Sequence, residues 1–305
     1  MLRRIRRASG ITRHFCIVAQ IMALSTKSGK PIAIVAGGDD DGLIVYTTSA
    51  PKTSKTALTA AQKALVAASL KKDGYSPDDS EPARLIERAL AGDHCSSIRA
   101  PAGGSFILHP SETPERVYVA GPSGAGKSTI TAQYIREWCD MHPDKPVFLF
   151  STHDGEKAYE ELPVTQIDLD QDFLEDPPGL AELKGSLVIF DDTDNLQDKH
   201  LQRAVQAVNS DLLANGRKHG IYTITLNHQI SDYSRTRTQL NEANRVVVFP
   251  NAGGTYHITR FLKVYAGFDK AQTKRFLDTS SRWACLGTTI PGYVITENEV
   301  YLVRQ

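Results

Sequence analysis

The sequence predicts an α/β protein in which a mostly parallel central sheet is flanked by helices and preceded by a small α+β module. Two observations support this prediction. From residue 116 onward, short apolar runs alternate with helical segments, which is typical of parallel strands buried on both faces. In addition, a glycine-rich loop, GPSGAGKST, joins the first of these predicted strands to the first of the helices.

The composition excludes several classes of protein. The chain has 305 residues, enough for one large domain or two small ones, and its 35 basic residues balance its 35 acidic ones. A basic excess over the whole chain is therefore absent, although one stripe of arginines facing DNA would not show in this sum. Four cysteines lie far apart with no C-x-x-C pair, so we expect reduced thiols and no zinc site: Cys16, Cys95, Cys139 and Cys285. No apolar run reaches the ~18–20 residues needed to span a bilayer, and we expect no membrane partner.

The N-terminal third is expected to contain two parts. Residues 1–30 carry seven lysines and arginines and no acidic residue. A mitochondrial transit peptide has this composition, but a basic tail, or an upstream start codon with translation from Met22, is the preferred interpretation. Residues 31–104 are expected to form the small module: a β-hairpin at 31–49, helices at 57–72 and 81–91, and a linker at 100–104.

Residues 105–305 are expected to form the main domain. Its predicted strands are 116–120, 146–151, 164–169, 186–192, 221–226, 244–249, 282–288 and 299–303. Its predicted helices are 128–138, 199–215, 255–265 and 270–277.

The glycine-rich loop fits the Walker A pattern G-x-x-x-x-G-K-[ST]. Glycines let the backbone turn tightly, so that successive N–H groups point at phosphate oxygens, and the following helix N-terminus adds positive partial charge. We expect Lys127 to bridge the β- and γ-phosphates of ATP, and Ser128 to hold Mg²⁺ with Thr129 as a helper. The alternative is an accidental glycine-rich turn. The predicted phosphate-binding residues are Gly121, Pro122, Ser123, Gly124, Ala125, Gly126, Lys127, Ser128 and Thr129.

The strand 186–192, SLVIFDD, supplies the carboxylates that hydrolysis requires. Asp191 is the predicted Walker B ligand of Mg²⁺, on a strand expected to lie beside the loop with its carboxyl end facing the nucleotide. Asp192 would orient and deprotonate the attacking water. Both aspartates could instead cap the following helix.

Two further features complete the predicted site. The strand 221–226 ends in Asn227, His228 and Gln229, one of which would contact the γ-phosphate; a helix cap is the alternative. Arg217 precedes that strand and is the candidate arginine finger, which would act on the nucleotide of a neighbouring subunit. Three other arginines are rivals for this role: Arg235, Arg237 and Arg260.

The order of these features over residues 114–303 resembles the FtsK-HerA superfamily of P-loop ATPases. The blocks that carry the resemblance are GPSGAGKST, FLFS, VIFDD, GRKHGIYTITLNHQ and NRVVVFP. They are most similar to the DNA packaging ATPases of nucleocytoplasmic large DNA viruses and their smaller relatives. In that superfamily an arginine precedes a strand that ends in a polar sensor, often Gln, which Arg217 and the pair His228–Gln229 match. The fold implied is a P-loop NTPase of the additional-strand type.

The resemblance implies an ATP-hydrolysing translocase that packages double-stranded viral DNA into a capsid. Its implied partners are DNA phosphates contacted without sequence preference, other copies of the chain in a ring of five or six, and a capsid portal or vertex protein. The implied location is a host-cell assembly site or the virion. Candidate DNA-contacting residues are Lys199, Arg203, Arg235, Arg237, Lys263, Lys274 and Arg275.

Two departures and two alternatives accompany this interpretation. The sensor Gln falls one position later than in the simplest alignment, which leaves His228 and Gln229 as equal candidates. The superfamily usually has Glu after the Walker B Asp, whereas this chain has Asp192, whose shorter side chain makes its role as base less direct. A nucleotide kinase with a P-loop would not need DNA for activity. An ATP-binding regulatory subunit would not need Asp192.

Overall fold

The computed structural model describes residues 21–50, 96–152, 157–230 and 236–304. The helices expected at 57–72 and 81–91 lie outside these residues, as do Cys16, Cys95 and Arg235. No helix within the described ranges is long and apolar enough to cross a membrane. Cys139 and Cys285 are both free thiols.

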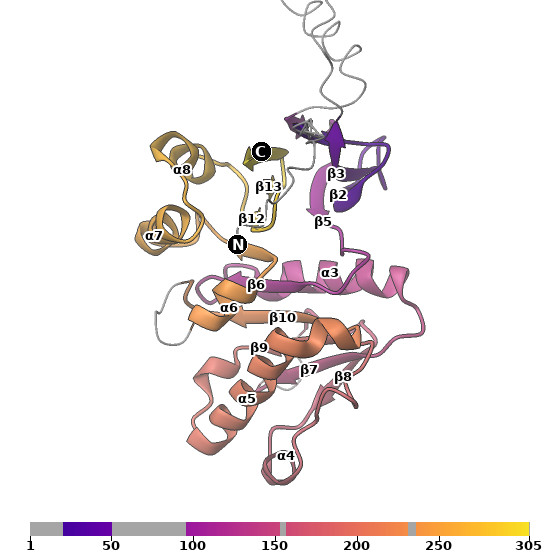
Figure 1. The fold of residues 1–305 in the computed structure, drawn as a ribbon, viewed down its shortest axis with the longest axis vertical. Coiled ribbons are helices and arrows are strands. Elements are labelled where there is room, and N and C mark those ends of the chain that lie inside the picture. The colour runs from indigo at the N-terminus through magenta and orange to yellow at the C-terminus, as the bar shows by residue number, and fades with distance from the viewer. Residues whose placement is uncertain (1–20, 51–95, 153–156, 231–235, 305) are drawn as a thin grey trace, which may run out of the picture.

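The main domain is built on a ten-stranded sheet, shown in Figure 1, in the order β4-β14-β13-β12-β11-β6-β10-β9-β7-β8. Six neighbouring strands are parallel to one another. They are β11 (Arg245–Val248), β6 (Arg116–Ala120), β10 (Tyr222–Asn227), β9 (Leu187–Asp191), β7 (Val147–Ser151) and β8 (Val164–Ile167). Four antiparallel strands extend the sheet beyond β11: β12 (Ala284–Gly287), β13 (Gly292–Thr296), β14 (Glu299–Arg304) and β4 (Ser97–Arg99). The predicted α/β class with a mostly parallel sheet is confirmed.

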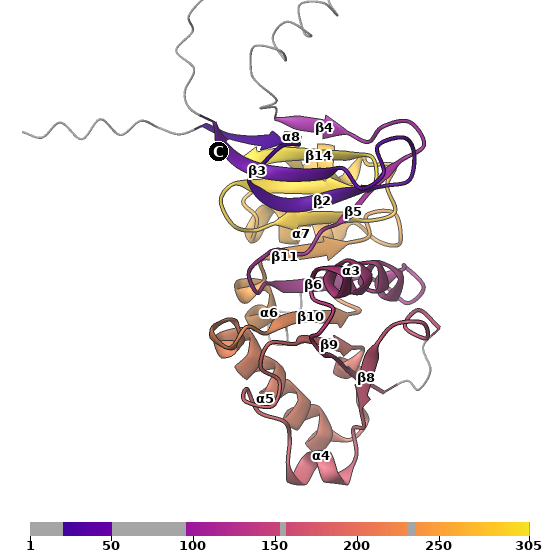
Figure 2. The same ribbon diagram turned by 90° about the vertical axis from the view of Figure 1, so that its right-hand side faces the viewer.

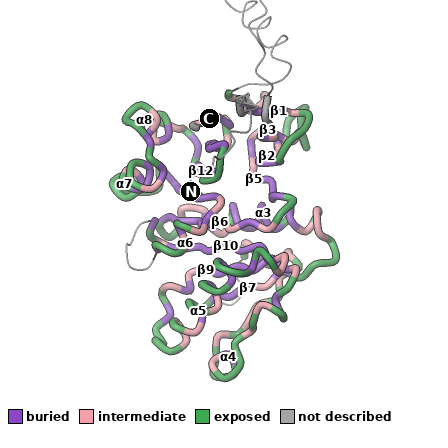
Figure 3. Tube along the Cα trace, viewed as in Figure 1, coloured by how far each residue is buried: buried purple, intermediate pink, exposed green. Residues whose placement is uncertain are grey.

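Helices cover both faces of the sheet, which explains why the central strands are apolar throughout. Every residue of β9, β10 and β11 is buried, and Figure 3 shows buried residues following the strands. The helices are α3 (Lys127–Met141), α4 (Gln171–Glu175), α5 (Lys199–Asn215), α6 (Arg237–Glu242), α7 (Tyr256–Val264) and α8 (Lys270–Leu277). The short helices α4 and α6 were not predicted, because five or six residues are too few to show a helical period.

A second, four-stranded antiparallel sheet packs against α3 and the antiparallel strands (Figure 2). Its order is β1 (Ile21–Ser25), β3 (Ile44–Ala50), β2 (Lys30–Ala36) and β5 (Ser105–Leu108). The hairpin expected at 31–49 is formed by β2 and β3. However, β1 lies inside the segment 1–30, and β5 lies beyond residue 104. Since β4 joins the large sheet, position 104 does not separate the two sheets in the chain.

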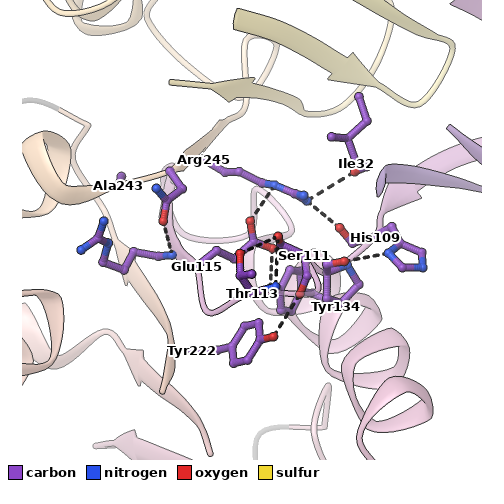
Figure 4. Close-up of polar contacts among 12 residues, drawn as sticks. Ile32, His109, Ser111, Thr113, Glu115, Tyr134, Tyr222, Ala243 and Arg245 are labelled. Atoms are coloured by element: carbon purple, nitrogen blue, oxygen red, sulfur yellow. Dashed lines mark hydrogen bonds and ion pairs between the residues drawn. The ribbon is translucent and has the colours of Figure 1, made fainter. Parts of the chain in front are cut away.

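A buried ion pair joins the two sheets (Figure 4). Arg245 Nε lies 3.0 Å from Glu115 Oε2, with the two side chains 0% and 3% exposed. Tyr134 in α3 donates its hydroxyl to Glu115 Oε1 at 2.8 Å. Arg245 Nη1 donates to the carbonyl oxygens of His109 at 2.8 Å and Ile32 at 3.3 Å. The pair therefore ties the start of β11 to the segment before β6, to α3 and to the small sheet.

The surroundings keep this guanidinium charged. Burial is the largest single effect and opposes the charged form of Arg245, but Glu115 acts together with Tyr293, Cys285 and Tyr134 to raise the pKa of Arg245 above its usual range. Removing either charge would therefore leave the other buried and uncompensated, which is costly.

We predict that Glu115→Gln lowers the free energy of unfolding by about 3–5 kcal/mol, because it strands a buried guanidinium. Urea unfolding followed by circular dichroism measures this change. The matched control is Arg282→Gln, which removes a pair to Glu297 whose arginine is 77% exposed and should cost less than about 1 kcal/mol. Equal losses in the two variants would show that the buried pair does not hold the sheets together.

Candidate nucleotide-binding and catalytic site

The site lies where three neighbouring parallel strands end. In the register of the sheet Ala120 of β6 pairs with Asn227 of β10, and Leu226 of β10 pairs with Asp191 of β9. Because parallel strands point the same way, the segments that follow them meet at one edge. The glycine-rich loop, the polar residues after β10 and the two aspartates are therefore brought together, as ligand sites in open α/β sheets commonly are.

One expectation about this edge was wrong. The Walker B strand β9 does not lie beside the Walker A strand β6, because β10 is inserted between them. This inserted strand is the additional strand of the predicted fold type. Strand order in a sheet depends on which helices cross which face, and the local sequence of β9 carries no sign of it.

The glycine-rich loop has the conformation that its glycines allow. Gly126, the residue before α3, has φ 105°, and Gly124 has φ 74°, both in the region that other residues rarely adopt. At Gly121 a Cβ atom would lie 2.5 Å from Cδ2 of Phe249, so only glycine fits there. The loop ends at Lys127, the first residue of α3, so that its backbone N–H groups lie at a helix N-terminus.

Lys127, Asp192 and His228 form a connected polar cluster. Lys127 Nζ lies 3.5 Å from Asp192 Oδ1 and 3.5 Å from His228 Nδ1. His228 Nε2 lies 3.2 Å from Asp192 Oδ2. One neutral tautomer satisfies all three contacts: Nε2–H donates to the carboxylate, while Nδ1 accepts from the ammonium group. Lys127 is 6% exposed, whereas Asp192 and His228 are 20% and 30% exposed, so the cluster opens to solvent at His228 and Asp192, although the Oδ1 atom of Asp192 is buried.

Asp192 has an unusual backbone. Its φ of 50° is the one positive value outside glycine in the part of the chain that the structure describes. A left-handed aspartate costs of the order of 1–3 kcal/mol and is kept where the surroundings require it. Here the turn follows β9 directly and leaves the Asp192 carboxylate beside Lys127 and His228. The expected alternative, capping of the next helical turn, is not what its side chain does.

Asp191 is buried and hydrogen-bonded, and it is placed as a candidate oxygen donor for Mg²⁺. It is 2% exposed and accepts a hydrogen bond from the Tyr159 hydroxyl at 2.8 Å through Oδ2. With Ser128 in the first turn of α3, it offers a carboxylate and a hydroxyl, the hard oxygen donors that suit Mg²⁺. In the described ranges no group of three or more His, Cys, Asp or Glu side chains could hold a metal ion by itself.

The structure separates the three polar residues after β10. Asn227 is buried and donates from Nδ2 to the Tyr118 hydroxyl at 3.2 Å, and that hydroxyl donates to the backbone oxygen of Gln229 at 2.6 Å. Tyr118 thus fixes the turn that leads His228 toward Lys127. The side chain of Gln229 is exposed. Sequence reasoning left His228 and Gln229 equal, and it is His228 that contacts the other site residues.

Asp194 adds negative charge beside the cluster. Burial raises the pKa of this carboxyl; His228 and Lys127 act against the rise, and the charge of Asp192 adds to it. Its Oδ1 atom is buried with no hydrogen-bond partner in the structure. Sequence reasoning gave Asp194 no role beyond the turn after the strand. Its electrostatic coupling to all three cluster members places it next to the site.

The candidate arginine finger lies at the opposite edge of the sheet. Arg217 is exposed in the short 3₁₀ turn Gly216–His219, just before the amino end of β10. Since β10 spans six residues at ~3.3 Å each, roughly 20 Å of strand separates Arg217 from its own cluster. Arg217 therefore does not contribute to the cluster of Lys127, Asp192 and His228 in its own chain. Arg237 and Arg260 are also exposed, in α6 and α7.

Comparisons with known proteins place the chain in a family. No family model matches the sequence. The uncharacterized protein V3 of Sputnik virophage is 38% identical over 198 residues, which cover 64% of this chain and 80% of V3. The chain belongs to the family of this virophage protein.

Solved structures with some similarity include viral and bacterial ATPases. The genome packaging NTPase B204 from Sulfolobus turreted icosahedral virus 2, in complex with AMPPCP, is 12% identical with a TM-score of 0.41, over 60% of this chain and 98% of B204. The cytoplasmic domain of the type VII secretion ATPase EccC of Thermomonospora curvata is 10% identical with a TM-score of 0.38, over 60% of this chain and 25% of that one.

We predict that Gly126→Ala weakens binding of a fluorescent ATP analogue about 5- to 30-fold. A side chain at φ 105° costs about 1–2 kcal/mol, and the loop can relieve that strain only by losing its phosphate-binding shape. Gly185→Ala is the matched control, since Gly185 has φ 76° and open space around its Cα but precedes the amino end of β9. It should lose stability without losing affinity; an equal loss of affinity in both would contradict the loop's role.

Proposed function

We propose that this protein is an ATP-hydrolysing translocase that packages double-stranded viral DNA into a capsid. The observation that carries the hydrolytic part is the cluster of Lys127, Asp192 and His228 next to Asp191, at the edge where β6, β10 and β9 end. The virophage relative supports a viral setting. The sequence resemblance of residues 114–303 to DNA packaging ATPases supports DNA as the molecule that is moved.

The side chains of the cluster suit hydrolysis of ATP by water. The loop and Lys127 would hold the β- and γ-phosphates, and Ser128 and Asp191 would hold Mg²⁺, which shields phosphate charge when bound. A triphosphate carries more negative charge than one carboxylate, so Lys127 Nζ would leave Asp192 Oδ1 for the phosphate. That oxygen could then accept a proton from water attacking the γ-phosphorus.

His228 would compensate for the short side chain of Asp192. Its Nε2–H contact, 3.2 Å from Oδ2, would hold the carboxylate in one orientation while Oδ1 faces the water. A fixed carboxylate loses less freedom in the transition state than a mobile one. In this proposal His228 is a positioning residue for Asp192 and replaces the extra methylene of the usual Glu.

Translocation requires a positive surface that can follow DNA phosphates. Lys199, Arg203, Arg237, Lys263 and Lys274 are exposed and remain candidates. Arg275 is already engaged, because its Nη2 lies 2.7 Å from Glu299 Oε1 and its guanidinium lies 3.7 Å from the centre of the Tyr301 ring. Ring assembly, a capsid vertex or portal partner, and location at an assembly site or in the virion belong to the same proposal.

A nucleotide kinase is disfavoured by the strand order. A P-loop nucleoside kinase would normally lack a sensor strand after its Walker B strand, whereas here β10 lies between β6 and β9 and brings His228 to the carboxylate of Asp192. A subunit that only binds ATP would have no use for this contact.

We predict that Asp192→Asn lowers kcat for ATP hydrolysis about 10²–10⁴-fold and leaves ATP binding intact, because the amide cannot take a proton from water. A phosphate-release assay and a fluorescent-nucleotide titration measure the two quantities. Asp198→Asn is the control: Asp198 caps α5 away from the cluster, and Asn caps a helix equally well. Unchanged turnover in Asp192→Asn would favour the regulatory subunit.

We predict that double-stranded DNA of any sequence stimulates hydrolysis, and that the stimulation falls as salt rises, because the contacts are to phosphates. Steady-state hydrolysis is measured with two unrelated duplexes at several salt concentrations, together with nucleoside monophosphates as possible phosphoryl acceptors. Transfer of phosphate to a monophosphate with no response to DNA would instead identify a kinase.

A further inference from the structure

A large groove lies at the amino edge of the sheet, opposite the nucleotide-binding edge. It has a volume of about 530 Å³ and is lined by residues of α6, α7 and the β12–β13 segment. Its apolar lining includes Leu240, Phe261, Tyr265, Phe268 and Leu286. The same groove is lined by Arg217 and by Ile290, whose side chain is 82% exposed.

The opposite edge carries an exposed aromatic side chain. Tyr256, the first residue of α7, is 69% exposed. The two residues after it, His257 and Ile258, line a hollow together with Gly121 and Pro122 of the phosphate-binding loop. Helix α7 therefore runs from the nucleotide-binding edge, at Tyr256, to the groove, at Phe261 and Tyr265.

Three exposed apolar side chains lie near the two ends of helix α7. In the described ranges four large hydrophobic side chains are exposed: Leu43, Tyr256, Val264 and Ile290. Val264 at the end of α7 and Ile290 lie at the groove end, whereas Tyr256 lies at the loop end. A protruding ring at one end and a groove at the other are unlike surfaces, which pair head to tail; a two-fold dimer would need one surface that matches itself.

The charges at the loop end and at the groove end are also complementary. The loop end will carry the phosphates of the nucleotide and the partly exposed carboxylate of Asp192. The groove end presents the exposed guanidinium of Arg217, whose charge is opposite to that of the phosphates and the carboxylate at the loop end.

We propose that the groove is the docking site for a second copy of this chain, whose Tyr256 enters it. This inference rests on the self-association in the proposed function and names the surfaces that make it. A tyrosine supplies a large apolar ring with a polar tip, the type of side chain that anchors protein interfaces. Docking in this way brings Arg217 of one copy to the phosphate-binding edge of the next, and repetition of the contact gives a ring or a filament.

Disulfide cross-linking tests the pairing directly. Two variants that each add one cysteine, Thr255→Cys beside Tyr256 and Ile290→Cys in the groove, are made in a background with Cys16, Cys95 and Cys139 changed to Ser and the buried Cys285 retained, and one carries a mass tag. With an ATP analogue and mild oxidant, the mixture should form a cross-link between the two variants, and neither variant should cross-link alone. Cross-linking of Thr255→Cys with itself would mean a two-fold contact, and no cross-link in assembled protein would place the interface elsewhere; either result overturns the proposal.

Assembly without cross-linking provides a second test. Tyr256→Ala should raise the dissociation constant for self-association at least ~10-fold by light scattering, as expected for an interface anchor. Leu43→Ala, at an exposed apolar residue of the small sheet, should leave it unchanged. An equal rise of the dissociation constant in both variants, or no rise in either, would contradict docking through Tyr256. These readouts need neither DNA nor hydrolysis, so a chain that assembles this way but lacks DNA-stimulated turnover fails only the proposed function.

Discussion

The hydrogen-bond register of β6, β10 and β9 is the constraint on which the site depends. It ends the three strands at the same level, so that segments about 35 to 100 positions apart in the chain meet at one edge. A shift of β10 by one residue would turn its polar end to the other face of the sheet. Lys127, Asp192 and His228 would then lose their mutual contacts, although each residue would still follow its own strand.

The rest of the fold supports this register at the opposite edge of the sheet, where the strands begin. The Arg245–Glu115 pair fixes the starts of β11 and β6 against α3 and the small sheet. The pair is buried, and Arg245 Nη1 and Glu115 Oε1 are both hydrogen-bonded, while the opposite edge has glycines, a left-handed aspartate and exposed side chains. Buried polar contacts thus hold the edge where the strands begin, and the site residues lie on loops at the edge where the strands end, as is common for functional sites on packed sheets.

Sequence patterns were sufficient for the features that are local. The glycine loop, the carboxylates after LVIF, the hairpin at 31–49 and the helix 199–215 each follow from residues close together in the chain. Strand order was implied only by the resemblance to additional-strand ATPases, because the insertion of β10 between β6 and β9 depends on packing across the whole domain and leaves no sign in the local patterns. The choice of His228 over Gln229 did not follow from the sequence, since the Tyr118 hydroxyl that fixes this turn comes from a different strand. Strands as short as β4 and β5 show no periodicity that could reveal them.

In the proposed translocase, ATP hydrolysis at one site drives movement along DNA. Displacement of a triplex-forming strand measures this coupling most directly. A labelled third strand is bound at one end of a duplex, and its release is followed after the protein and ATP are added. The account predicts release that requires ATP, is lost in Asp192→Asn, and is delayed in proportion to the length of duplex before the triplex. Hydrolysis stimulated by DNA with no release of the third strand would contradict it.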